Sequence, residues 1–158
     1  MNQLRLALAT SLYLGLVPVA PGTFGTLGGV AIAWALAGTQ QYLLWSLLAA
    51  ALLYLVGRSL GAWAEERGGG KDPGWFVLDE VVGYLVTVAW IGGPSLLALL
   101  TAFCAFRFFD IVKPWPVKRF ERVPGGDGIM LDDVVAGLWA LLAVMLPLRL
   151  LVDAPWTA

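Results

Sequence analysis

The sequence predicts an all-α fold: a compact, membrane-embedded bundle of about six helices, with several short or broken transmembrane helices. Of the 158 residues, 59% are hydrophobic and only 13% are charged, whereas a soluble domain carries about 25% charged residues. Glycine and proline breakers separate apolar runs of helical length, and no stretch alternates apolar with polar residues as a half-buried strand would. The length suits a single domain covering residues 1–158.

The positions of these breakers define the expected helices. They cover residues 4–17, 26–36, 42–63, 79–91, 95–109 and 134–152, and a polar segment at 110–131 lies between the last two. A helix of about 13 residues rises only about 20 Å, against a hydrocarbon core of about 30 Å, so the shorter runs cannot cross a bilayer as straight rods. For this reason a soluble bundle with an unusually apolar interior is the alternative.

Several classes of protein are excluded by residues that the chain lacks. It has no histidine and one cysteine, Cys104, so a disulfide framework, a thiolate cluster within one chain and a histidine-dependent phosphatase are excluded. The Cys-x5-Arg, Asp-x-Asp-x-Thr and Gly-x-Ser-x-Gly nucleophile motifs are also absent. The net charge of −1 gives no general attraction for nucleic acid, so none is expected as a partner. The oligomeric state stays open.

Five carboxylates lie in three short polar segments beside apolar runs: Asp79-Glu80, Asp110 and Asp132-Asp133. Taken alone, each acidic pair reads more simply as the N-terminal cap of a helix. If each tight turn reverses the chain direction, however, all three segments reach the same end of the bundle. Carboxylates that converge without a cation repel one another, and Mg²⁺, which prefers carboxylate oxygens, relieves that repulsion. We therefore predict a Mg²⁺ site there. Lysine and arginine also gather at this end, which places it in the cytoplasm.

Other polar residues at the same end are candidates for binding a phosphate. Arg107 and Lys113 flank Asp110 at i,i+3 spacing, which suits either phosphate contacts or two surface ion pairs. Thr23 and Thr26 lie where a helix starts, so its N–H groups can receive an anion, although a simple helix cap is the alternative. Gly126 and Gly128 permit a close backbone approach to a ligand, or form a flexible connector.

Three segments together resemble the bacterial phosphatidylglycerophosphatase A family. They read VAPGTFGTLGG, DPGWFVLDEVVG and FRFFDIVKPWPVKRFERVPGGDGIMLDDVVAG, and they span roughly residues 18–138 in the family's order. The resemblance implies a Mg²⁺-dependent, all-α lipid phosphatase of the bacterial inner membrane that converts phosphatidylglycerophosphate to phosphatidylglycerol and inorganic phosphate. The resemblance also implies that the five carboxylates form the acidic site, together with Arg107, Lys113, the 21–23 loop, Gly126 and Gly128.

Our interpretation of the individual roles follows from the chemistry. The metal ligands are expected among Asp79, Glu80, Asp110, Asp132 and Asp133. Glu80 is also the candidate general base, and the catalytic set is Asp79, Glu80, Asp110 and Asp133. The expected partners are the substrate and membrane lipids. Two alternatives remain open: a membrane phosphatase for another lipid or prenyl phosphate, and a non-catalytic lipid-binding protein.

Overall fold

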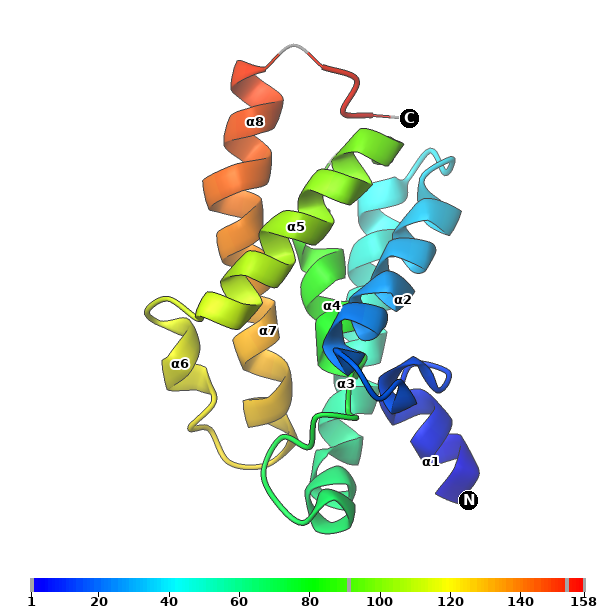
Figure 1. The fold of residues 1–158 in the computed structure, drawn as a ribbon. Helices are drawn as coiled ribbons and strands as arrows, with labels where there is room; N and C mark the ends of the chain where they lie inside the picture. Colours follow the sequence, from blue (N-terminus) through cyan, green and yellow to red (C-terminus); the bar gives the residue numbers. More distant parts are fainter. Residues whose placement is uncertain (1, 91, 153, 158) are drawn as a thin grey trace.

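The computed structural model describes residues 2–90, 92–152 and 154–157 and is built from helices (Figure 1). In chain order these are α1 (Asn2–Ala9), the 3-10 turn η1 (Leu14–Leu16), α2 (Pro21–Leu36), α3 (Tyr42–Gly68), α4 (Leu78–Thr87), α5 (Leu96–Val112), α6 (Val117–Phe120), α7 (Gly126–Ala140), the π-helical turn η2 (Leu141–Met145) and α8 (Leu146–Leu151). No strand forms within those described ranges, which contain one isolated bridge between Pro94 and Thr157. The all-α prediction is confirmed.

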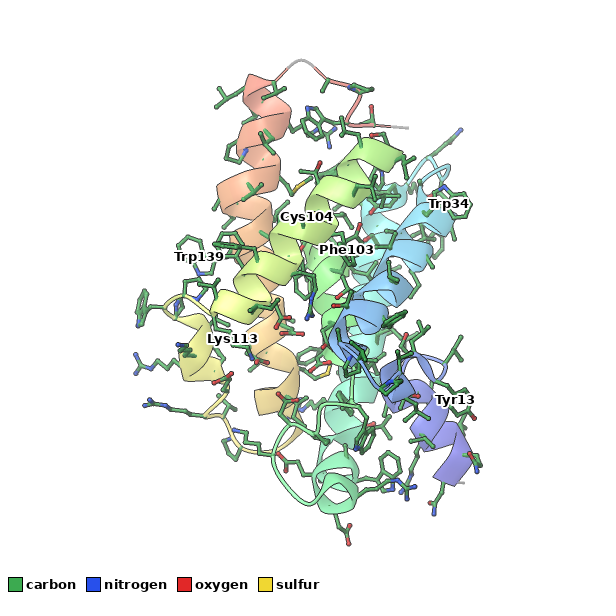
Figure 2. All side chains as sticks on the ribbon, viewed as in Figure 1. Tyr13, Trp34, Phe103, Cys104, Lys113 and Trp139 are labelled. Atoms are coloured by element: carbon green, nitrogen blue, oxygen red, sulfur yellow. The ribbon has the colours of Figure 1, made fainter. Side chains whose placement is uncertain are left out.

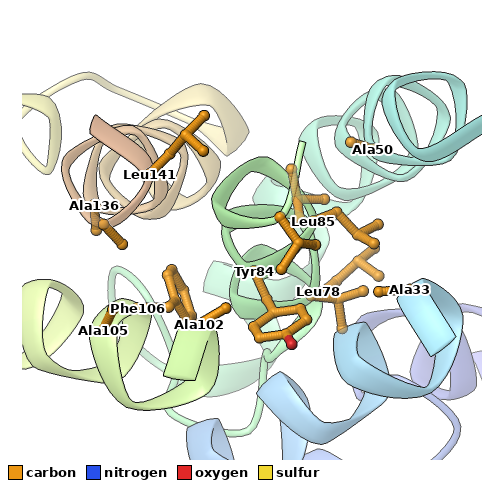
Figure 3. Packing of buried hydrophobic residues seen from close by; sticks show 14 of the residues in the cluster. Ala33, Ala50, Leu78, Tyr84, Leu85, Ala102, Ala105, Phe106, Ala136 and Leu141 are labelled. Carbon is orange, nitrogen blue, oxygen red and sulfur yellow. The ribbon is translucent and has the colours of Figure 1, made fainter. Parts of the chain in front are cut away.

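Helix α4 forms the centre of the bundle, and α2, α3, α5 and α7 pack around it (Figure 1). Eight of its ten residues are buried. Its Tyr84 hydroxyl donates to the Leu99 carbonyl at 2.9 Å, and its ring meets Phe106 edge to face at 6.5 Å. Figure 3 shows Tyr84 and Leu85 projecting from this central helix into the apolar core. Because neighbours surround α4, the carboxylates at its start are held inside the protein.

The N-terminal apolar run is not the single helix expected at 4–17. Helix α1 ends at Ala9, and Ser11, Leu12 and Tyr13 all adopt positive φ angles. The Thr10 side chain holds this reversal, since its hydroxyl donates to the Leu6 carbonyl and accepts from the Tyr13 N–H. The break in the helix depends on these local backbone angles, and the spacing of apolar residues gives no information about them.

The last helix begins earlier than expected. It starts at Gly126 and not near Val134, and it continues through η2 and α8 to Leu151 (Figure 1). Glycine allows this start, because a Cβ at Gly126 would collide with the backbone of Arg58 in α3. Asp132 and Asp133 therefore lie inside a helix, and the cap interpretation of this pair is wrong. The polar segment 110–131 also contains the short helix α6.

Two helical stretches are long and apolar enough to cross a membrane, Tyr42–Gly68 and Gly126–Leu151. Only 22% of the most apolar window of each is buried inside the protein, whereas the core helix of a soluble bundle is mostly buried. Large apolar side chains point outward from both stretches, among them Leu48 and Leu52 in the first and Leu138 and Leu142 in the second. This outward apolar surface fits a membrane protein.

The contact between α3 and α7 gives a first prediction. Substituting Gly126→Ala forces a Cβ into the Arg58 backbone, and we expect a loss of roughly 1–3 kcal/mol of stability from overpacking. Gly38→Ala is the matched control, because a Cβ there meets nothing within 4 Å. Thermal unfolding of the purified proteins in detergent tests this. Equal melting temperatures for the two variants would contradict the close helix contact.

Candidate active site: a buried acidic centre

Carboxylates from two helices meet at one end of the core. Oxygen atoms of Asp79 and Glu80, at the start of α4, and of Asp133, in α7, all lie within 4.8 Å of one another. Glycines permit this approach: a Cβ at Gly83 would collide with the Asp133 carbonyl, and one at Gly137 with the Gly83 carbonyl. Only 5% of Asp79 and 3% of Asp133 is exposed. We call this group the acidic centre.

Helix α5 brings Asp110 and Arg107 to the same place. An Arg107 Nη1 atom lies 2.6 Å from Asp110 Oδ2 and 3.8 Å from Glu80 Oε1. The guanidinium thus lies between carboxylates of two helices, and Asp110 is itself buried. The expected i,i+3 pair of Arg107 with Asp110 forms, so this arginine is already engaged by acids.

Lys113 departs from the expected spacing and pairs with α7. The residue ends α5 with a positive φ of 47°. Its Nζ donates to Asp132 Oδ2 at 2.8 Å and to Glu121 Oε1 at 2.7 Å, and the structure shows no ion pair with Asp110. Partial burial alone would lower the pKa of Lys113, but the hydrogen bonds to Asp132 and Glu121 outweigh it and raise the pKa above its usual range.

Two carboxylate oxygens are buried without a hydrogen-bond partner in the described part of the chain, Glu80 Oε2 and Asp132 Oδ1, and so is Arg107 Nε. Buried polar atoms are nearly always paired, because an unpaired one costs about 1–3 kcal/mol. Their donor chemistry points to two ligands: a cation for the oxygens and an anion for the guanidinium. An all-carboxylate donor set suits Mg²⁺, so these residues fit that ion.

Burial and mutual repulsion act on the carboxylates of the acidic centre. Burial, followed by the nearby charges of Glu80 and Asp133, raises the pKa of Asp79 well above its ordinary value. Burial likewise raises the pKa of Glu80 to about 7, and the Asp110 charge adds to the rise while Arg107 opposes it. The N-cap residue of α4 is Val77, although Asp79 Oδ1 accepts from the Glu80 N–H in the first helical turn at 3.0 Å. That bond uses one oxygen of Asp79 and does not explain why Glu80 and Asp133 lie so close to it.

A hollow of about 410 Å³ opens beside Asp132. Its lining comes from three segments and comprises Lys71, Asp72, Glu121, Arg122, Gly128 and Asp132. The Lys71 ammonium donates to the Val123 carbonyl at 3.0 Å and also to the Glu121 carbonyl, which ties the loop before α4 to the loop before α7. Sequence reasoning missed Asp72 and Glu121. Asp72 is the first residue of the family-like segment DPGWFVLDEVVG, and this position could have marked it as a candidate. Its neighbours, however, have the composition of a loop.

The remaining phosphate-binding candidates lie in different settings. Thr26 is fully buried, and its hydroxyl donates to the Gly22 carbonyl of its own helix at 2.8 Å. Thr23 is half-buried in the first turn of α2. Gly22 makes the closer approach: a Cβ there would collide with the Glu80 carboxylate and crowd Arg107. Gly126 packs on α3, and Gly128 lines the hollow.

Comparisons with known proteins point to one family. The sequence model of phosphatidylglycerophosphatase A matches residues 7–148. Phosphatidylglycerophosphatase A of Haemophilus influenzae is 40% identical over 134 residues, covering 82% of this chain and 80% of the relative. The Escherichia coli protein of that name is 35% identical over 129 residues, covering 78% and 72%. A Bacteroides thetaiotaomicron relative, described provisionally as a phosphatidylinositol-3-phosphatase, is 36% identical over 137 residues, covering 82% and 84%. No solved structure matches.

Proposed function

This chain belongs to the phosphatidylglycerophosphatase A family and is a phosphoric monoester hydrolase, and we propose that it hydrolyses phosphatidylglycerophosphate at the acidic centre with Mg²⁺ as its cofactor. The reaction breaks the terminal P–O bond with water and gives phosphatidylglycerol and inorganic phosphate. The observation that carries the assignment is the meeting of buried carboxylates, two of whose oxygens lack partners in the described residues.

The acidic side chains have two proposed roles, metal binding and proton transfer. Asp79, Glu80 and Asp133 would hold Mg²⁺, with Asp110 and Asp132 beside them. When bound, the ion supplies a Lewis acid for the phosphoryl oxygens and lowers the pKa of a bound water. Glu80 Oε2 has no hydrogen-bond partner in the described residues, so this oxygen is available to accept a proton from the attacking water.

The two basic residues orient the phosphate. Arg107 is half-buried and its buried Nε has no partner in the described residues, so it has a donor left for an equatorial phosphate oxygen. Lys113 holds Asp132 in place and adds positive charge beside it. Because both cations already touch carboxylates, they orient the acidic centre as well as the substrate.

The location proposed for the enzyme is the bacterial inner membrane, crossed more than once, with the acidic centre at the cytoplasmic side. This follows from charge placement along the bundle. The end that carries the acidic centre also carries Arg67, Lys71, Lys118, Arg119 and Arg122, whereas the opposite turns at 38–41 and 92–94 contain no lysine or arginine (Figure 1). The diacylglycerol part can then stay in the bilayer while the head group reaches the centre.

A substrate panel tests this function. Purified protein in detergent micelles with Mg²⁺ would receive phosphatidylglycerophosphate, phosphatidylinositol 3-phosphate or a prenyl phosphate, and released phosphate would be measured with malachite green. We expect the highest kcat/KM for phosphatidylglycerophosphate. The inositol lipid is the second candidate substrate, because one relative is described as acting on it. Faster turnover of another lipid would reassign the substrate, and no release from any would favour a lipid-binding role.

A further inference from the structure

A second hollow, which we call the basic hollow, shares Arg122 with the hollow beside Asp132 and is not used by the chemistry above. It measures about 390 Å³ and is lined by Trp115, Lys118, Arg119 and Arg122. All four residues are exposed. Within residues 2–90, 92–152 and 154–157, no carboxylate lies within ion-pair distance of the three cations. Three unneutralised cations around one hollow create a site for an anion.

Arg122 connects this basic hollow to the hollow beside Asp132. The same residue lines the hollow that contains Asp132 and Gly128. Its neighbour Glu121 accepts from Lys113, which in turn holds Asp132. A ligand with two anionic groups can therefore place one on each side of Arg122.

An apolar groove is lined by residues of α7 and by the residue that follows Trp115 in the chain. It measures about 220 Å³, has almost no polar surface and is lined by Pro116, Val135, Leu138, Trp139 and Leu142. Trp115 lines the basic hollow, and its neighbour in the chain, Pro116, lines the groove. The Trp139 ring stacks on Phe109 at 6.1 Å, and Figure 2 shows Trp139 on the same side of the bundle as Lys113 and α6.

This surface also suits the boundary of a membrane. Four of the groove residues belong to the apolar stretch Gly126–Leu151, which is long enough to span a bilayer. Trp115 is 77% exposed, and Ile111 and Val112 are exposed nearby in the chain. Tryptophan beside basic residues is typical of the lipid–water interface. The groove thus lies at hydrocarbon depth and the cations at head-group depth.

We propose that the basic hollow binds the internal phosphodiester of the lipid substrate while an acyl chain lies in the groove, so that the enzyme selects lipids with a diester as well as a terminal phosphate. This rests on the proposed function. In phosphatidylglycerophosphate a glycerol separates the two phosphates, and Arg122 lines both the basic hollow and the hollow beside Asp132. The diester's single negative charge and two free oxygens match Lys118 and Arg119. Phosphatidate, which has only the terminal phosphate, leaves this hollow empty.

The test compares two competing lipids on one double variant, Lys118→Ala with Arg119→Ala. Phosphatidylglycerol carries the diester without a terminal phosphate, and phosphatidate carries the reverse. Each is added to the phosphatidylglycerophosphate assay in mixed micelles at equal mole fraction. In the variant we expect the KM for the substrate and the inhibition constant of phosphatidylglycerol to rise about tenfold, as for lost charge-assisted contacts, while inhibition by phosphatidate changes far less.

The control removes two cations elsewhere, Arg5→Ala with Arg67→Ala, neither of which lines a hollow described above. It should leave both inhibition constants near wild type. An equal loss of inhibition by both lipids in the test variant would mean general attraction to anionic lipid, and no loss would mean no subsite; either result overturns the proposal. Thermal unfolding shows whether the variant is folded. If the wild type itself releases no phosphate, the proposed function fails first, which is a distinct outcome.

Discussion

Substituting Asp133→Asn should abolish phosphate release while the protein stays folded. The change keeps the side-chain shape and removes one negative charge from the group formed with Asp79 and Glu80. An amide is a poor Mg²⁺ ligand beside two carboxylates, so we expect kcat to fall by at least about 10³-fold, equivalent to roughly 4 kcal/mol of transition-state stabilisation. The apo-protein should be no less stable, because the substitution removes repulsion between buried acids.

The control for this variant is on the same helix. Asp127→Asn alters a carboxylate that pairs with Arg58 at 3.1 Å and accepts from Tyr54 at 2.7 Å, outside the acidic centre. Its side chain is partly exposed, so we expect a stability loss of at most about 1 kcal/mol and near wild-type turnover. The measurement is kcat for the two purified variants and the wild type in detergent. Wild-type kcat in separate variants at Asp79, Asp110 and Asp133 would exclude the acidic centre as the active site.

The sequence was informative wherever residue type alone decides the structure. Apolar composition and glycine or proline breakers gave the all-α class, and the family resemblance is confirmed over most of the chain. The reversal of direction at each turn led to the expectation that distant acids share one end, and Asp79, Glu80 and Asp133 do meet there. This inference succeeded because helix direction follows from turn positions without knowledge of packing.

What the sequence did not reveal depends on contacts between distant helices. The early start of α7 requires Gly126 to pack on α3, and a glycine pair in a polar segment equally suits a loop. The partners of Lys113 are Asp132 in α7 and Glu121 in the loop before it, and its own φ is positive. Spacing along one helix predicted a pair with Asp110 instead. Tertiary contacts decide such cases, and a pattern within one segment does not contain them.

Removing Mg²⁺ should stop phosphate release and also change how stability depends on pH. Burial raises the pKa of Glu80 from its ordinary 4.5 to about 7. The unfolded chain therefore releases this proton at lower pH than the folded protein, so the contribution of Glu80 to the stability of the apo-protein is fully present below pH 4.5 and is lost as pH rises through 7. The shift corresponds to a loss of order 3 kcal/mol. Buried Asp79 changes stability in the same direction.

Bound Mg²⁺ should reverse that trend, because it binds the deprotonated carboxylates. At a concentration 100 times its Kd, the ion adds about 2.7 kcal/mol of stability, and its affinity grows as Glu80 and Asp79 lose their protons. Thermal unfolding with EDTA and with Mg²⁺ should therefore give similar melting temperatures near pH 5 and well-separated ones near pH 8. Glu80→Gln, whose side chain cannot titrate, should reduce the difference between the melting temperatures measured with Mg²⁺ and with EDTA at pH 8. Full phosphate release in EDTA, with melting curves that coincide at every pH, would show that the acids are neutralised by something other than a divalent cation.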